Sequence, residues 1–244
     1  MPNDLLLAIE SATKRASVAL LRGTDVVAER DAEDGDHHAE RLLPMVDALL
    51  HDADVKLAEV GCFAVSIGPG AFTSLRIGLA TLKGLAFETE APVAVVSTLH
   101  ALAHAAVAGG RVEPGERCVP LLDARRGELY GGVYSRAEPG KDRLESAVDD
   151  FVYSPEELGA RFEGPVRLVG EGAGIFGDAL VRAAADRAEV RVDPGEPVWP
   201  DARSVGAIGV ALLAAGEGRS VAGLVPSYLR RAQAEEERVA RRSD

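Results

Sequence analysis

The chain of 244 residues contains little cysteine and no long hydrophobic run. Its two cysteines, Cys62 and Cys118, do not form a disulfide framework. Both lie in apolar stretches, so we expect buried, reduced thiols. Charged residues interrupt every apolar stretch well before the ~20 residues that a membrane-spanning helix needs. The N-terminal residues also lack the basic and apolar segments of a signal peptide, so we expect a cytoplasmic protein with no membrane partner.

Basic residues are also scarce, because 27 Lys and Arg stand against 39 Asp and Glu, which gives a formal net charge of -12. A surface this acidic repels phosphate backbones, so direct binding of nucleic acid is disfavoured. The C-terminal tail carries the one candidate basic patch, which consists of Arg230, Arg231, Arg238, Arg241 and Arg242. Residues 235–237 are all glutamate and interrupt this patch, which favours a solvated tail.

Apolar residues and turn formers follow each other through the first half in a way that predicts a mixed α/β sheet. Three short apolar runs separated by polar turns predict an antiparallel meander at residues 5–10, 16–21 and 26–29. Helical spacing then predicts a helix over residues 36–53, and Thr73 is the expected N-cap of a second helix ending near residue 87. The remaining elements of this half are expected at residues 62–67, 92–96 and 98–108. The order of elements is thus βββαβαβα.

The second half begins like the first. An apolar run ends in Asp123 as the first run ends in Glu10, and a polar turn and a returning strand follow each of them. This pattern is either an internal repeat or the similarity that any two hairpins share.

We expect two lobes separated by a linker rich in turn-forming residues at 109–115. The N-terminal lobe covers residues 1–110. The C-terminal lobe covers residues 111–244 and includes a helix near 203–215 and the charged tail.

Six residues are candidates for a vestigial nucleotide or anion site: Glu10, Gly68, Gly70, Asp123, Gly170 and Gly172. A glycine loop between a strand and a helix aims backbone N–H groups at one point, and Arg76 could add positive charge there. The loop lacks the Lys-Ser/Thr ending of a P-loop, and the residues favour the alternative of a tight turn needed for packing. Glu10 and Asp123 could hold a hydrated cation, or they could equally cap turns.

Histidines at positions 100 and 104 lie four residues apart, so on a helix they share a face, as zinc ligands do. No third ligand lies near them, and no glutamate between them could act as a base. The adjacent His37 and His38 have no partner one turn further on. We therefore predict surface histidines and no metal site.

The helix that follows the glycine loop has apolar residues nearly all round, because only Arg76, Lys83 and Glu88 are charged. Such a helix must be buried on nearly all sides. Small residues at Gly78, Thr81 and their neighbours allow another backbone to approach. Either the sheet and helices of this chain cover it, or a second protein covers part of it.

Five segments taken in order, LLAIESATKRASVAL, HHAERLLPMVDALL, GPGAFTSLRIG, LLDARRGELY and PSYLRR, resemble the TsaB (YeaZ) family. The resemblance implies an actin-like (ASKHA, ribonuclease H-like) α/β fold of two related lobes. It also implies a non-catalytic subunit of tRNA threonylcarbamoyladenosine modification that docks the catalytic subunit TsaD and the ATPase TsaE. Such a subunit forms a homodimer in isolation and contacts tRNA only indirectly. It binds no cofactor alone, and ATP or ADP would sit at the interface of the complex.

The resemblance further implies a partner surface on the two N-lobe helices, formed by Arg41, Met45, Ala48, Ser74, Arg76, Gly78, Thr81, Leu82 and Leu85. The metal-binding His-x-x-x-His motif of the catalytic relative falls on Thr98 and Leu102 here, so the metal is expected to be absent. The chain departs from the family pattern at Glu10, where Asp is usual, and at Ala71 and Ser74, where Ser and Gly are usual.

Two enzymatic alternatives remain open. One is an ATP-dependent phosphotransferase of the actin-like class, which would need a phosphate loop in each lobe and an adenosine loop. The other is an M22-like metallopeptidase, which would need a bound zinc at His100.

Overall fold

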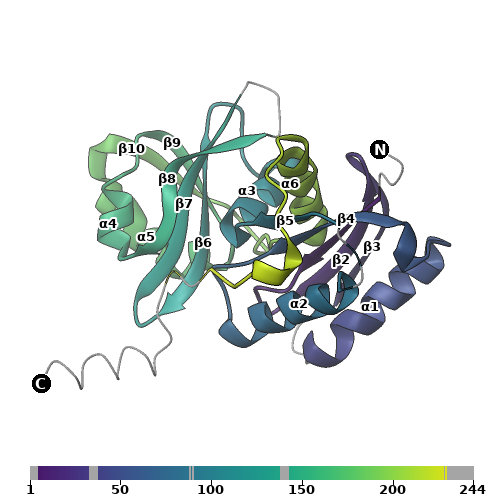
Figure 1. Ribbon diagram of the computed structural model, residues 1–244. Helices are drawn as coiled ribbons and strands as arrows, with labels where there is room; N and C mark the ends of the chain where they lie inside the picture. Colours follow the sequence, from purple (N-terminus) through teal and green to yellow (C-terminus); the bar gives the residue numbers. More distant parts are fainter. Residues whose placement is uncertain are drawn as a thin grey trace, which may run out of the picture.

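The computed structural model describes residues 5–32, 38–87, 89, 91–137, 143–227 and 229. The first residues of the helix predicted over 36–53, His37 and the C-terminal arginines lie outside this part of the chain. Two five-stranded sheets form the centres of two lobes that lie side by side (Figure 1). The first sheet consists of β1 (Leu5–Glu10), β2 (Ala16–Arg22), β3 (Asp25–Ala32), β4 (Val60–Ser66) and β5 (Val93–Val96). The second consists of β6 (Arg117–Arg125), β7 (Glu128–Arg136), β8 (Leu144–Tyr153), β9 (Gly164–Val169) and β10 (Ala188–Val192).

The two sheets have the same topology. The first has the strand order β3-β2-β1-β4-β5, and the second, taken from its other edge, has the order β8-β7-β6-β9-β10. In each sheet the first strand of the repeat pairs antiparallel with the second and parallel with the fourth. The internal repeat is therefore confirmed, and the chain has the expected actin-like α/β fold of two related lobes with mixed sheets.

Helices cover both faces of each sheet. The α-helices are α1 (His38–Asp52), α2 (Phe72–Leu85), α3 (Thr98–Ala108), α4 (Pro155–Gly159), α5 (Glu171–Ala184) and α6 (Ala202–Ala214). Three short 3-10 segments are η1 (Leu57–Glu59), η2 (Ala185–Arg187) and η3 (Val221–Gly223). Within the described residues, no helix combines the length and apolarity that crossing a bilayer requires.

Alternation along β1 separates two hydrophobic cores on the two faces of the first sheet. Leu7 and Ile9 point toward α1 and α2, where they pack in one cluster with residues such as Leu42. Leu6 and Ala8 point to the opposite face, where they pack in a second cluster. Because successive side chains of a strand face opposite sides, a strand buried on both faces reads as one continuous apolar run.

The last helix of each repeat packs on the sheet of the other lobe. Helix α3 follows the first sheet in sequence but packs against β6 and β7, whereas α6 follows the second sheet but packs against β1, β2, β4 and β5. A Cβ atom on Gly206 would lie 2.4 Å from Leu21 Cδ1, and one on Gly209 would lie 2.6 Å from Ala64 Cβ, so glycine permits this close approach. We expected the helix near 203–215 to belong to the C-terminal lobe. This helix, α6, instead packs on one face of the first sheet, so that expectation is wrong as to where the helix packs.

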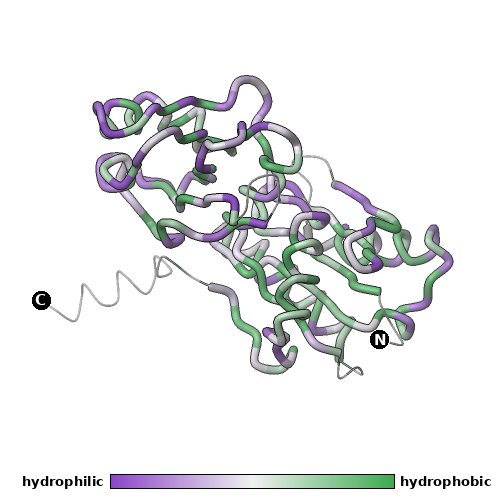
Figure 2. The backbone as a smooth tube through the Cα atoms, turned by 90° about the horizontal axis from the view of Figure 1, so that it is seen from above, coloured by the Kyte–Doolittle hydropathy of each residue, from purple (hydrophilic) through white to green (hydrophobic). Residues whose placement is uncertain are grey.

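Smaller differences concern helix α2, strand β8 and the thiols. Thr73 lies inside α2 and is not its N-cap. The N-cap is Ala71, two residues earlier, and it makes no side-chain capping hydrogen bond. Strand β8 was not expected, because its exposed charged residues obscure the strand pattern. Cys118 is buried as expected, whereas Cys62 is half-buried. Figure 2 shows hydrophobic stretches within the lobes and hydrophilic turns toward the outer ends of the molecule.

Candidate functional site

The glycine loop between β4 and α2 is closed by other parts of the same chain. A Cβ atom on Gly68 would lie 2.6 Å from Ser227 O, and one on Gly70 would lie 2.3 Å from Ala12 O. The backbone N–H of Ala71, at the start of α2, already donates to Ala12 O at 2.8 Å. The two glycines therefore allow backbone segments to pack closely, as the alternative of a tight turn predicts. The loop does not form an open anion cradle around Gly68.

Glu10 lies beneath this loop and is fully buried. Its Oε1 accepts a hydrogen bond from Ala12 N at 2.6 Å, while its Oε2 has no hydrogen-bond partner within the described residues. Burial raises the pKa of Glu10 to about 7, and the nearby Ser66 hydroxyl and the Ala12 N–H oppose this shift. The side chain thus holds the β1–β2 turn, and it is not exposed to hold a hydrated cation.

An interlobe pocket of about 400 Å³ lies where the two repeats meet. The turn after β1, the last residues of β6 and the N-terminal ends of α2 and α5 line it, including Lys14, Gly70, Asp123, Arg125 and Glu171. Asp123 caps its own turn, because its Oδ1 accepts from Arg125 N at 2.8 Å and its Oδ2 pairs with the Arg125 guanidinium at 3.2 Å. Two acids therefore accompany two bases in this pocket, which does not concentrate positive charge as a phosphate site does.

The glycines before and within α5 serve packing against β6. A Cβ atom on Gly170, whose φ is +89°, would lie 2.7 Å from Leu121 O, and one on Gly172 would lie 2.8 Å from Leu121 Cβ. Glu171 lies between them and lines the interlobe pocket, whereas the two glycines do not. Of the six residues predicted for a nucleotide or anion site, the structure brings Gly70 and Asp123 together in that pocket.

Helices α1 and α2 form a layer over the outer face of the first sheet (Figure 1). Most of the predicted partner residues are exposed or half-buried on this layer. Arg41 and Arg76 are exposed, while the half-buried members are Met45, Ala48, Ser74, Thr81 and Leu85. On α2, Ser74, Thr81 and Leu85 follow helical spacing and form one stripe. We define the α1–α2 surface as the exposed and half-buried residues Arg41, Leu43, Met45, Ala48, Phe72, Ser74, Arg76, Thr81 and Leu85.

Two predicted partner residues are buried within the chain instead. Leu82 has no exposed surface and belongs to the core cluster beneath the layer. A Cβ atom on Gly78 would lie 2.1 Å from Ser11 Oγ, which donates a hydrogen bond to Ser74 O at 3.1 Å. These two residues pack α2 onto the sheet, so the expectation that they face a partner is wrong.

Three exposed hydrophobic residues of this region were not among the predicted partner residues. Leu43 is 54% exposed, Phe72 is 39% exposed and Phe87 is 83% exposed. The Arg76 guanidinium lies over the Phe72 ring at 3.8 Å from its centroid. Leu43 follows Leu42 directly, and the sequence does not tell which of two adjacent leucines points to the core.

The two histidines of α3 were expected on the surface, but the chain partly covers both of them. His100 and His104 are half-buried, and the His100 ring stacks on Tyr134 with centroids 5.2 Å apart. Burial lowers the pKa of His100 to about 4, and the nearby His104 adds to this shift. Within the described residues, no group of three or more His, Cys, Asp or Glu side chains is placed to hold a metal ion.

Comparison with known proteins identifies the family. The family described as "TsaD: tRNA N6-adenosine threonylcarbamoyltransferase" matches residues 31–237. The TsaB protein of Escherichia coli is 32% identical over 92% of this chain and 94% of its own length. The TsaB protein of Bacillus subtilis is 30% identical over 94% of this chain and 96% of its own length. Both carry the description "tRNA threonylcarbamoyladenosine biosynthesis protein TsaB".

Solved structures agree with this result. YeaZ from Pseudomonas aeruginosa is 30% identical and covers 92% of this chain with a TM-score of 0.77. A second structure, described as a protein with similarity to the peptidase YeaZ from Pseudomonas aeruginosa, is 32% identical and covers 93% of this chain with a TM-score of 0.78. In each case, 99% of the solved chain is matched. The chain therefore belongs to the TsaB (YeaZ) family of tRNA threonylcarbamoyladenosine biosynthesis proteins.

Proposed function

We propose that this chain is a non-catalytic subunit that docks a TsaD-like catalytic subunit through the α1–α2 surface. The observation that carries the proposal is the exposure of Leu43 and Phe72 beside the half-buried stripe of α2. Small and apolar residues on two adjacent helices suit the packing of two helices from a partner, as ridges of one layer fit grooves of the other. Exposed apolar groups gathered in this way are typical of protein–protein contacts.

The family and the net charge support the following set of proposed partners. With a net charge of -12, the chain is unsuited to binding tRNA by itself, so tRNA contact would be indirect and made through the complex. A TsaE-like ATPase would join the pair, and ATP or ADP would bind at the interface of the complex. In the absence of the catalytic subunit, the same α1–α2 surface would pair two copies of this chain. We further propose that the protein acts in the cytoplasm.

The enzymatic alternatives receive less support. A phosphotransferase needs a phosphate cradle in each lobe, and the interlobe pocket instead balances Lys14 and Arg125 against Asp123 and Glu171. A metallopeptidase needs a third ligand beside His100 and His104, and the described residues offer none in reach. Neither arrangement supplies the residues that such chemistry requires.

The docking proposal predicts that Ala48→Arg breaks association with the TsaD-like subunit. Ala48 is half-buried near the middle of α1, so a long cationic side chain there would hold the partner helices apart. We expect binding to weaken by roughly a hundredfold, which corresponds to a hot-spot loss of about 3 kcal/mol. Co-expression of both subunits followed by size-exclusion chromatography and calorimetric titration measures this loss.

A matched control separates docking from general surface effects. Ile175 on α5 is 58% exposed and lies on the other lobe, so Ile175→Arg should co-elute with the partner as the wild type does. The near-ultraviolet circular dichroism of both variants should match that of the wild type. If Ala48→Arg remained folded and co-purified at the wild-type level, the assignment of the surface would have to be abandoned.

A further inference from the structure

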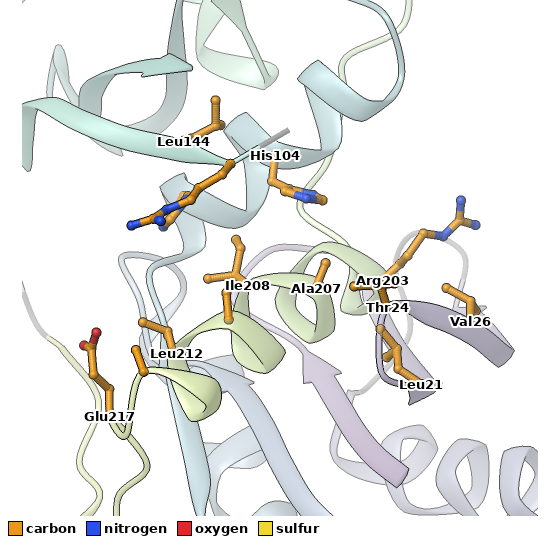
Figure 3. Close-up of a pocket in the computed structure, with 14 residues that line it drawn as sticks. Leu21, Thr24, Val26, His104, Leu144, Arg203, Ala207, Ile208, Leu212 and Glu217 are labelled. Atoms are coloured by element: carbon orange, nitrogen blue, oxygen red, sulfur yellow. The ribbon is translucent and has the colours of Figure 1, made fainter. Parts of the chain in front are cut away.

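The chain after α6 passes from one face of the first sheet to the other. Helix α6 packs on the face opposite α1 and α2. Figure 3, a close view of a pocket beside α6, shows Leu212 on the last turns of this helix and Glu217 just beyond its end. Residues 218–227 then reach the other face, where Leu224 joins the core cluster beneath α1 and α2. We call residues 218–227 the C-terminal strap.

Backbone hydrogen bonds hold the start of the C-terminal strap along β5, the strand at one edge of the first sheet. Arg219 and Val93 lie opposite each other in an antiparallel bridge, and the N–H of each donates to the carbonyl oxygen of the other at 2.9 Å. A Cβ atom on Gly218 would lie 2.9 Å from Pro92 Cβ, so the backbone passes close to the residue before the strand. The strap therefore follows this edge of the sheet as it passes to the other face.

The middle of the C-terminal strap packs against α2, as the yellow segment beside α2 in Figure 1 shows. Its 3-10 segment η3 contacts α2, and Leu224, directly after η3, is 4% exposed and lies in one cluster with Leu79 and Leu82 of α2. Helix α1 packs over β2 and β3, and α2 packs over β1 and β4, whereas the strap pairs with β5. Because the strand order is β3-β2-β1-β4-β5, α2 is held between α1 and the strap.

The end of the C-terminal strap meets the glycine loop that precedes α2. The N–H of Ser227 donates to Ile67 O at 2.7 Å. A Cβ atom on Gly68 would lie 2.6 Å from Ser227 O and 3.3 Å from Cδ1 of Leu75, which lies in the first turn of α2. The strap therefore contacts α2 along its side and also packs on the loop from which α2 begins.

We propose that the C-terminal strap, through Leu224, positions α2 beside α1 and so sets the shape of the α1–α2 surface. This inference rests on the docking function proposed above, and it makes Leu224 a positioning residue that acts through α2. Two helices accept the ridges of a partner only if their own separation and angle match it. Fixing that arrangement in the free chain reduces the ordering that association would otherwise require.

Leu224→Ala should loosen α2 selectively. The readout is amide hydrogen exchange of the full-length chain, taken as the exchange rate at Leu79 and Leu82 of α2 relative to the rate at Val46 of α1. We expect this ratio to rise by about tenfold or more, because the truncation removes the support of α2 by the strap. Affinity for the TsaD-like subunit in calorimetric titration should fall by about tenfold. Leu224→Met keeps most of the apolar volume and should restore both values.

Leu180→Ala is the matched control, because Leu180 is also buried but lies in the core of the other lobe. It should lower the free energy of unfolding without changing the exchange ratio or the affinity of the folded protein. Arg219→Pro tests the strap without opening a core, since it removes the N–H that donates to Val93 O. It should raise the exchange ratio and weaken association, whereas Arg219→Ala, which keeps this N–H, should do neither.

The two readouts distinguish failure of this inference from failure of the docking proposal. An unchanged exchange ratio in both Leu224→Ala and Arg219→Pro would overturn the positioning role of the strap. A raised ratio combined with wild-type affinity would show that the placement of α2 does not govern docking, and it would also overturn the inference. A wild-type chain that does not bind the TsaD-like subunit would refute the docking proposal, while the exchange ratios would still decide whether the strap positions α2.

Discussion

Leu82→Glu is expected to unfold the N-terminal lobe and not merely to release a partner. Leu82 has no exposed surface and packs in the cluster that includes Phe63 and Leu79. The substitution removes a buried apolar side chain and places a carboxylate among the hydrophobic side chains of this cluster. Large-to-small changes in cores alone cost roughly 2–5 kcal/mol, and an unpaired buried charge adds to this. Urea unfolding should show a loss of about 4 kcal/mol or more, against a typical total stability of about 5–15 kcal/mol.

Leu43→Glu is the matched control for that experiment. Leu43 lies on α1 in the same layer and is 54% exposed, so its substitution should change the free energy of unfolding by less than about 0.5 kcal/mol. The comparison also bears on docking, because a folded Leu43→Glu variant that fails to bind identifies a surface effect. A wild-type unfolding curve for Leu82→Glu would contradict the packing of α2 described above.

Glu10→Gln is expected to stabilise the protein at alkaline pH and to leave it nearly unchanged in acid. Burial raises the pKa of Glu10 from 4.5 to about 7. Below pH 4.5 the carboxyl is protonated in both the folded and the unfolded state. Between pH 4.5 and 7 the unfolded state loses its proton first, so the free energy of unfolding falls as pH rises. Above pH 7 this loss is complete and is on the order of 3 kcal/mol, because one pKa unit corresponds to about 1.4 kcal/mol.

Gln removes the ionisation but keeps an oxygen that accepts from Ala12 N. Urea unfolding of the wild type and the variant at pH 5 and pH 8 gives the difference between them at each pH. The difference in the free energy of unfolding between the two proteins should grow with pH. The lowered pKa of His100 makes stability change in the opposite direction below pH 6.5, but His100 is present in both proteins, so its contribution cancels in the difference. Asp178→Asn, an exposed change on α5, should shift the free energy of unfolding by less than about 0.5 kcal/mol at both pH values. An identical pH profile for wild type and Glu10→Gln would rule out a protonated, buried Glu10.

The buried state of Glu10 also bears on its departure from the family pattern, where aspartate is usual at this strand end. The carboxylate acts within the chain, because it holds the N–H of Ala12, and Ala12 O in turn accepts from the start of α2. This connects the β1–β2 turn to the helix that carries half of the α1–α2 surface. We infer that Glu10 stabilises the geometry of the proposed docking surface and not a bound phosphate or cation.

Strand and helix positions in the N-terminal lobe were largely predictable, because apolar periodicity and turn residues agree there. The runs ending at Glu10 and at Asp123 also indicated the repeat, which the matching strand orders confirm. Strand β8 was missed because half of its residues are exposed at the edge of the second sheet, and its charged residues interrupt the apolar pattern. Helix α6 was located from its pattern, but the sheet on which it packs is not encoded in local spacing.

For the candidate site too, some features could be predicted from the sequence and others depended on how the chain packs. Motif order, without any coordinates, was enough to indicate the family, and the resemblance implied the two-lobed fold. Composition alone determined the acidic character of this chain, because net charge depends only on the residues present. Only the folded chain decided that Leu82 is inside while Leu43 is outside, and that Gly68 and Gly170 accommodate neighbouring segments of the chain. The burial of a side chain depends on what packs over it, and those neighbours lie far away along the sequence.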